Sequence, residues 1–238
     1  MACRSKTAPW APDVKPLVDR LLTDGIPADA VDIYEGRNRV VRLMHEGRHV
    51  NIKQFKVPNI VNRLAYTTVR SSKAERAYEY ALRLRNLGFN TPEPLAYAER
   101  RNGPLLGLSY FVSQQLEGFC DMRTIGEDDD RAVLADELGA LMARMHDMGV
   151  WMKDFSQGNV LRRRGPKGHY EFFLVDINRM QFDVTDSRRL MDNFGRITDD
   201  PSFLRILARA YSRHSGRPVD EMMAQATAAY NRYHKAKI

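Results

Sequence analysis

The chain has 238 residues, of which 43% are hydrophobic and 28% are charged. This ordinary globular composition excludes a disordered or collagen-like chain, and the two cysteines, Cys3 and Cys120, exclude a disulfide framework. Lys and Arg (37) outnumber Asp and Glu (30), and the resulting net charge of +7 favours anionic partners. We find neither a membrane-spanning apolar run nor a signal peptide, and we therefore expect a cytoplasmic protein.

The first half of the chain predicts a small antiparallel sheet with one helix. Residues 1–30 are rich in proline and predict loop around a short helix near Lys15–Leu22. Ser72 precedes Glu75 by three residues, which is the spacing of a helix capping box, so a helix is expected from there to about Leu87. Short apolar runs separated by turn residues predict five strands, at 31–34, 40–43, 50–55, 95–99 and 108–115.

The second half is predicted to be mainly helical. An apolar stripe at helical spacing, from Leu134 to Met145, predicts a helix that begins near 128–130 and ends at Gly149. A hairpin is expected to turn at residues 165–168, between strands at 159–164 and 170–177. Further helices are expected near 186–194, 201–214 and 219–235.

Three polar side chains lie in a loop or at the end of a strand, where catalytic or metal-binding residues are expected. Asp154 and Asn159 belong to a loop between the apolar helix and the hairpin. Asp176 follows the apolar run Phe173–Val175 and therefore sits at the end of a strand. Carboxylate and amide oxygens are the ligands that Mg²⁺ prefers in proteins, and all three groups could face one cleft.

At these residues the chain resembles the protein-kinase-like superfamily. Asp154 and Asn159 are similar to the aspartate and asparagine of the catalytic loop, and Asp176-Ile177-Asn178 is similar to the metal-binding Asp-Phe-Gly motif. Val50-Asn51-Ile52-Lys53 resembles the strand that carries the phosphate-binding lysine. The segment from Phe111 to Gly118 resembles the hinge between the two lobes.

The lipopolysaccharide kinase (Kdo/WaaP) family is the closer resemblance. The segments Ser72–Tyr80 and Leu87–Pro94 look like a helix and a following loop of that family, and the chain lacks a long activation segment. The resemblance implies an α+β, two-lobed protein-kinase-like fold with an extension (1–30), a five-stranded lobe with one helix (31–116) and a reduced, mainly helical lobe (117–238). It also implies ATP-dependent phosphorylation of a sugar hydroxyl, on Kdo or heptose, in the lipopolysaccharide inner core.

The resemblance assigns a role to each candidate residue. Lys53 would hold the α- and β-phosphates of ATP, and Glu79, or alternatively Glu75, would hold Lys53. Asp154 would accept the proton of the attacking hydroxyl. The remaining candidates are Asn159 and Asp176 for Mg²⁺, and Gly36, Arg37, Gln114 and Leu116 beside Lys53 for the nucleotide.

The chain departs from the kinase pattern at three places. It has no Gly-x-Gly-x-x-Gly loop, so Gly36 stands alone in the expected phosphate-covering turn. Met152 occupies the position where protein kinases carry a histidine, and Asn178 replaces the glycine of the metal loop. Two alternative functions therefore stay open, a minimal protein Ser/Thr kinase and a pseudokinase scaffold with little activity.

Two further patterns have both a functional and a structural interpretation. The basic run Arg162–Arg164 predicts either a solvated strand edge or contact with an anionic glycolipid and the inner membrane, whereas nucleic acid is not expected because no aromatic platform accompanies it. His45-Glu46-Gly47-Arg48-His49 matches the spacing of a zinc protease. Because Gly47 and strand-like neighbours disfavour the required helix, we interpret this segment as a solvent-exposed turn.

Overall fold

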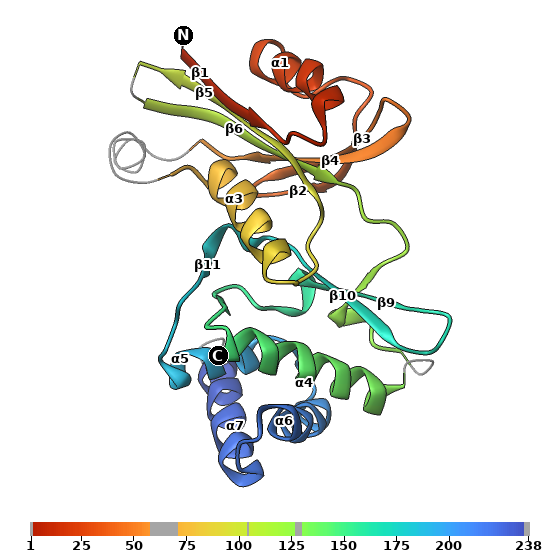
Figure 1. Ribbon diagram of the computed structural model, residues 1–238, viewed down its shortest axis with the longest axis vertical. Helices are drawn as coiled ribbons and strands as arrows, with labels where there is room; N and C mark the ends of the chain where they lie inside the picture. The colour runs from red at the N-terminus through yellow and green to blue at the C-terminus, as the bar shows by residue number, and fades with distance from the viewer. Residues whose placement is uncertain (1, 58–70, 104, 127–129, 236–238) are drawn as a thin grey trace. The chain divides into compact units, whose positions relative to one another are not determined.

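The computed structural model describes residues 2–57, 71–103, 105–126 and 130–235. The chain divides into two compact units, Met1–Glu117 and Gly118–Ile238 (Figure 1). Within the described residues, no helix combines the length and the apolar character needed to cross a bilayer.

The first unit is built on one antiparallel sheet of six strands in the order β1-β5-β6-β4-β3-β2. The five strands expected within residues 31–116 are confirmed, and residues 2–7, which were expected to be loop, add a sixth strand along β5. The strands are β1 (Ala2–Thr7), β2 (Val31–Glu35), β3 (Arg39–His45), β4 (Arg48–Phe55), β5 (Pro94–Asn102) and β6 (Leu105–Gln114).

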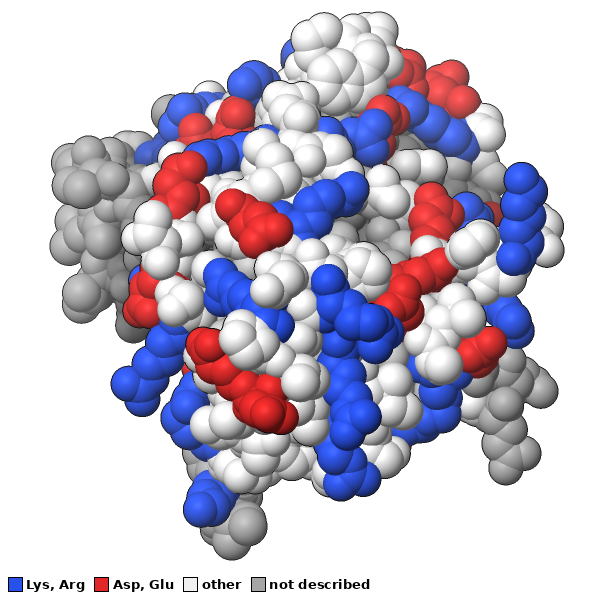
Figure 2. Space-filling model, turned by 60° about the horizontal axis from the view of Figure 1, so that its bottom comes forward, with Lys and Arg blue, Asp and Glu red and all other residues white. Residues whose placement is uncertain are grey.

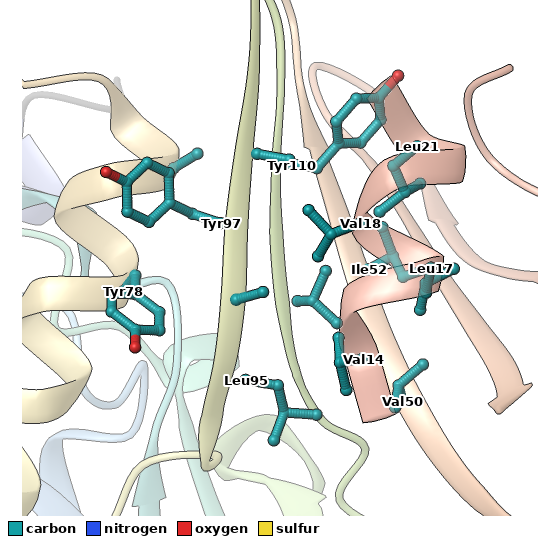
Figure 3. Close-up of a cluster of buried hydrophobic side chains, with 14 of the residues drawn as sticks. Val14, Leu17, Val18, Leu21, Val50, Ile52, Tyr78, Leu95, Tyr97 and Tyr110 are labelled. Carbon is teal, nitrogen blue, oxygen red and sulfur yellow. The ribbon is translucent and has the colours of Figure 1, made fainter. Parts of the chain in front are cut away.

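Two helices of the first unit lie on opposite faces of this sheet (Figure 3). The helix α1 (Lys15–Thr23), which follows the 3₁₀ turn η1 (Pro12–Val14), packs its buried leucines against Val50 and Ile52 of β4. The helix α3 (Lys73–Asn86) covers the other face. Its predicted capping box is confirmed, because the Ser72 hydroxyl accepts a hydrogen bond from the Glu75 N–H at 3.0 Å.

The register of the sheet determines which face carries Lys53. Lys6, Tyr97, Phe111 and Lys53 stand directly opposite one another on β1, β5, β6 and β4. Side chains that are opposite one another in an antiparallel sheet point to the same face. Tyr97 lies on the α3 side of the sheet, so Lys53 belongs to that side, whereas its neighbour Ile52 faces α1 (Figure 3).

The second unit contains the helices and the hairpin that the sequence predicts. The hairpin strands β9 and β10 pair as expected, and the short strand β7 adds to β9. The helices are α4 (Arg131–Asp147), α5 (Ser187–Met191), α6 (Pro201–Ser215) and α7 (Val219–Lys235). The strands are β7 (Cys120–Asp121), β8 (Trp151–Met152), β9 (Val160–Arg164), β10 (Tyr170–Leu174) and β11 (Met180–Gln181). The 3₁₀ turns are η2 (Met122–Thr124), η3 (Gln157–Asn159), η4 (Ile177–Arg179) and η5 (Asp192–Gly195).

The pairing of β8 with β11 positions the candidate site. Met152 stands opposite Met180, and Trp151 stands opposite Gln181. The loop that carries Asp154 begins directly after β8, and the turn η4 ends directly before β11. This two-stranded sheet therefore holds the loop and the turn side by side within the second unit.

Candidate active site

The loop between β8 and β9 is closed by its own hydrogen bonds. The side-chain amide of Asn159 donates to the carbonyl of Asp154 at 2.8 Å, and the Asn159 N–H donates to the Ser156 carbonyl at 2.9 Å. These bonds fix the orientation of the Asn159 amide, and its Oδ1 atom accepts no hydrogen bond from the residues that the structure describes. Asn159 therefore offers one uncommitted, oriented oxygen.

Asp176 lies beside this loop at the end of β10. The Val175 N–H donates to the Asn159 carbonyl at 3.0 Å, which extends the β9–β10 register by one residue toward the loop. Asp176 itself adopts the left-handed conformation (φ 56°, ψ 43°), in which few residues other than glycine, asparagine and aspartate are found. This backbone turns the chain from the strand into η4.

The asparagine that replaces the metal-loop glycine contacts Asp176. The Asn178 side-chain amide donates to Oδ1 of Asp176 at 2.6 Å, and Asn178 is buried. The amide thereby orients the carboxylate. The arrangement of Asn159 and Asp176 fits the predicted Mg²⁺ site in its donor chemistry, since both side chains present hard oxygens.

Two arginines hold the Asp154 carboxylate. Arg179 Nη1 lies 3.0 Å from Oδ2 of Asp154, and Arg196 Nη1 lies 3.0 Å from Oδ1. Neither arginine was predicted. Arg179 belongs to η4, directly after the metal-loop residues, so its position in the sequence offered a signal; Arg196 follows η5 and offered none.

A buried hydrogen-bond network supports the loop from behind. The Asn193 amide donates to the carbonyl of Met152 at 2.7 Å, and Asn193 Oδ1 lies 3.2 Å from His146 Nε2. On its other side, His146 Nδ1 lies 3.0 Å from the Tyr211 hydroxyl. These partners assign the Nε2–H tautomer, in which Nδ1 accepts from Tyr211. The loop is thus anchored through the backbone of Met152, and the buried side chain at that position is apolar.

The burial of His146 predicts a specific pH dependence of stability. Desolvation lowers the pKa of His146 from 6.5 to about 4 in the folded protein. Because the unfolded chain takes up this proton at higher pH, the stabilisation is fully present above about pH 6.5 and is lost progressively as the pH falls toward 4. When this contribution of His146 is lost completely, the free energy of unfolding falls by about 3 kcal/mol.

Denaturant unfolding of the wild type and of His146→Gln at pH values from 7 to 4.5 measures this effect. The wild type should lose stability over this range more steeply than the variant, because glutamine does not titrate. The carboxylates of Asp136 and Asp200 also have lowered pKa values, and their contribution is lost at still lower pH, below about 4. Parallel pH profiles for the two proteins would contradict the assignment to His146.

In the first unit, both candidate glutamates of α3 contact β1. Lys6 Nζ lies 2.8 Å from Oε1 of Glu79, and Arg4 Nη2 lies 2.6 Å from Oε1 of Glu75. The hydrogen bond from Lys6 to Glu79 raises the pKa of Lys6 above its ordinary value. Sequence reasoning missed these partners because it assigned β1 to a loop. The pairing of Lys53 with Glu79 stays a prediction.

The expected phosphate-covering turn connects β2 and β3. The Gly36 N–H donates to the Asn38 carbonyl at 3.2 Å, and both Gly36 and Arg37 are exposed. A Cβ atom on Gly36 would lie 2.5 Å from the Tyr34 hydroxyl oxygen, so the ring of Tyr34 occupies the space beside this glycine. The nucleotide contacts of Gly36 and Arg37 stay predictions.

The segment that resembles a hinge begins within β6 and continues beyond the end of that strand. The N–H of Gln114, the last residue of the strand, donates to the Glu93 carbonyl at 2.9 Å. The Gln115 amide connects two neighbours: its oxygen accepts from Asn51 and its nitrogen donates to the Leu116 carbonyl, each at 2.8 Å. These bonds fix the backbone on both sides of Gln115, while the nucleotide contacts of Gln114 and Leu116 stay predictions.

The zinc-protease spacing does not form a metal site. His45 ends β3 and His49 lies in β4, and the turn between them, Glu46-Gly47, has positive φ at both residues. His45 contacts the Asp13 carbonyl and His49 contacts Glu117. Across the residues that the structure describes, no three His, Cys, Asp or Glu side chains are grouped to hold a metal ion.

Two solved structures have a fold similar to that of this chain. WaaP in complex with acyl carrier protein matches with a TM-score of 0.63 and 17% identity, over 99% of this chain and 98% of that one. A protein from Ralstonia eutropha assigned as an aminoglycoside phosphotransferase matches with a TM-score of 0.53 and 12% identity, over 91% and 86% of the two chains. The fold is protein-kinase-like, as the sequence predicts.

The family model for the lipopolysaccharide kinase (Kdo/WaaP) family matches residues 25–206. The chain therefore belongs to this family, and it is an ATP-dependent kinase that phosphorylates a sugar of the lipopolysaccharide core. No curated protein matches the chain significantly.

Proposed function

We propose that the protein phosphorylates a hydroxyl of Kdo or heptose in the inner core, with Asp154 as the general base. The observation that carries this proposal is the closed loop in which Asn159 holds the Asp154 carbonyl and lies beside Asp176, within a chain of this family. Carboxylates that act as general bases must reach the proton that they accept, and Asp154 is 18% exposed in its side chain.

The reaction has a simple balance of atoms. The acceptor oxygen forms a bond to the γ-phosphorus of ATP, the bond from that phosphorus to the bridging oxygen breaks, and ADP leaves with the electron pair. The proton of the acceptor hydroxyl passes to Asp154. Phosphoryl transfer needs positioning and charge neutralisation more than covalent participation by the protein.

Asn159 and Asp176 are the proposed ligands of Mg²⁺. Asn159 presents the oxygen that its own hydrogen bond orients, and Asp176 presents a carboxylate held by Asn178. When bound, Mg²⁺ neutralises the charge of the phosphate oxygens. Lys53, held by Glu79 or Glu75, is the proposed partner of the α- and β-phosphates.

A transfer assay tests the proposed function. Purified protein is incubated with γ-labelled ATP, Mg²⁺ and either lipid-linked inner-core oligosaccharide or a generic protein substrate. Label should appear on the sugar and not on the protein. Label on the protein alone would favour a protein kinase, and ATP binding without transfer to either acceptor would favour a pseudokinase.

We propose, further, peripheral contact with the membrane that carries the acceptor. This membrane contact is supported by one segment of the chain, the β9–β10 hairpin, in which Arg163, Arg164 and Lys167 are exposed. Arg162 does not contribute, since it is buried and donates to the Thr124 carbonyl at 2.8 Å. Arg163 already pairs with Glu171 at 2.7 Å. On the face that Figure 2 shows, basic and acidic side chains are interspersed.

Vesicle sedimentation measures this contact. The double variant Arg164→Ser/Lys167→Ser should bind anionic vesicles several-fold more weakly than the wild type, since each basic residue near such a surface is worth about 1 kcal/mol. The difference should shrink as salt is raised, because exposed charges are screened. Equal binding at all salt concentrations would contradict the contribution of the hairpin.

A further inference from the structure

Two cations already contact the carboxylate of the proposed base. Arg179 Nη1 contacts both carboxylate oxygens of Asp154, at 3.4 Å and 3.0 Å, and Arg196 Nη1 contacts Oδ1 at 3.0 Å. An acceptor hydroxyl that approaches Asp154 must compete with these charge-assisted hydrogen bonds. Drawing the arginines from the carboxylate would therefore make more of its oxygen lone pairs available to the acceptor during the reaction.

Arg196 is held in position by its surroundings. Its guanidinium lies over the ring of Tyr233 at 5.2 Å, and its carbonyl accepts from the Gln157 N–H of the catalytic loop at 3.2 Å. The preceding Gly195 lies against α7, because a Cβ there would be 2.9 Å from the Ala229 carbonyl oxygen. The position of Arg196 is thus set by α7 and by the loop, independently of Asp154.

Arg179 is the more accessible of the two arginines. Its side chain is 47% exposed, compared with 35% for Arg196 and 18% for Asp154. It ends the turn η4 immediately before β11, and β11 is fixed by its pairing with β8. The two guanidinium groups therefore project to one carboxylate from separately anchored segments, and both retain solvent-accessible surface beside it.

We infer that Arg179 and Arg196 bind an anionic group of the acceptor, a carboxylate or a phosphate, next to the hydroxyl that is phosphorylated. Guanidinium groups match the geometry of both anions, and their hydrogen bonds to such groups are strong. An anion bound here takes over hydrogen bonds that Asp154 now receives. The Asp154 oxygens become available to the hydroxyl only when the charged acceptor is in place, so the same two residues select the acceptor and release the base.

This inference rests on the proposed function of Asp154, and it makes a separate claim about the acceptor. A neutral sugar offers no charge to exchange for the Asp154 carboxylate. It would leave both arginines on the base and would be a poor substrate. A sugar acid, or a sugar that carries a phosphate beside the acceptor hydroxyl, would be a good one.

Steady-state kinetics on matched acceptors tests the inference. The acceptors are a lipid-linked inner core with its free carboxylate, the same core with that carboxylate methylated, and the same core treated with phosphatase. The KM of the wild type should rise roughly 10- to 100-fold for the acceptor that has lost the recognised anion. The acceptor that shows the rise identifies the anion as carboxylate or phosphate.

Two arginine variants and one control complete the experiment. In Arg179→Gln, the KM for the charged acceptor should rise by a similar factor, the KM for ATP should stay unchanged, and the discrimination between charged and blocked acceptors should disappear. Arg179→Lys should recover part of the discrimination. Arg188→Gln, at an exposed arginine of α5, is the matched control and should behave as the wild type.

The outcomes separate this inference from the proposed function. If the wild type phosphorylates all three acceptors with the same KM, or if Arg179→Gln weakens all acceptors equally, the arginines only brace the loop and the inference is wrong. If the wild type transfers phosphate to none of them, the proposed function is wrong, and calorimetric binding of the acceptors decides the anion site. Acceptor binding that requires both the anionic group of the acceptor and Arg179 would support the anion site. Acceptor binding that is unchanged when the anionic group or Arg179 is removed would overturn it.

Discussion

Replacing Asp154 by asparagine should lower the turnover of core phosphorylation by about 10²- to 10⁴-fold, the usual contribution of a general base. Asparagine keeps the shape of the side chain but cannot accept the proton at neutral pH. The backbone carbonyl of Asp154, which the Asn159 amide contacts, is unaffected by the change. The affinity for ATP and Mg²⁺ should therefore stay close to that of the wild type.

A transfer assay combined with thermal shift measures both parts of this expectation. Asp220→Asn, at an exposed aspartate of α7, makes the same chemical change elsewhere in the second unit and should leave turnover unchanged. Normal turnover in Asp154→Asn would refute its role as the base. Loss of ATP binding together with turnover would instead assign Asp154 to the nucleotide site.

Replacing Asp176 by asparagine should remove the Mg²⁺-dependent part of ATP binding. At an ATP concentration of about 100 times its Kd, the wild type should gain about 2.7 kcal/mol of stability, which raises Tm by roughly 5–10 °C in a protein of this size. The variant should show little of this shift, because an amide cannot replace the charge of the carboxylate. Asparagine tolerates the left-handed backbone at this position, so the variant should fold.

Asp183 provides a matched control for this variant. It also has a positive φ (60°) and lies in the second unit, and it is exposed. Asp183→Asn should keep the full ATP-dependent rise in Tm. An unchanged rise in Asp176→Asn, with and without chelator, would contradict the assignment of Asp176 to the metal.

The helices and strands could largely be predicted because their signals are local. Ser72 and Glu75 define the start of α3 through a single hydrogen bond, and Asp200 caps α6 through its contact with the Ser202 N–H at 2.7 Å. The loop residues Asp154 and Asn159 could be proposed as candidates for the same reason, since their spacing is short and is bounded by recognisable elements. These features depend on neighbours in the sequence.

The features that were missed depend on distant partners. Strand β1 has no strong strand pattern of its own and forms by pairing with β5, about a hundred residues later. Arg196 contacts Asp154 across 42 positions, and Asn193 reaches the Met152 carbonyl across 41. No local pattern distinguishes these side chains from ordinary polar residues, so only the folded chain shows what they do.

The added strand has a practical consequence for anyone who shortens this protein. A version that begins at residue 25, where the family match starts, would lack both β1 and α1. It would leave β5 as a bare sheet edge with unpaired backbone groups and would expose the apolar surface around Val50 and Ile52. Such a fragment would be prone to associate with itself through that edge, and α3 would lose the two cations that Arg4 and Lys6 place on its glutamates.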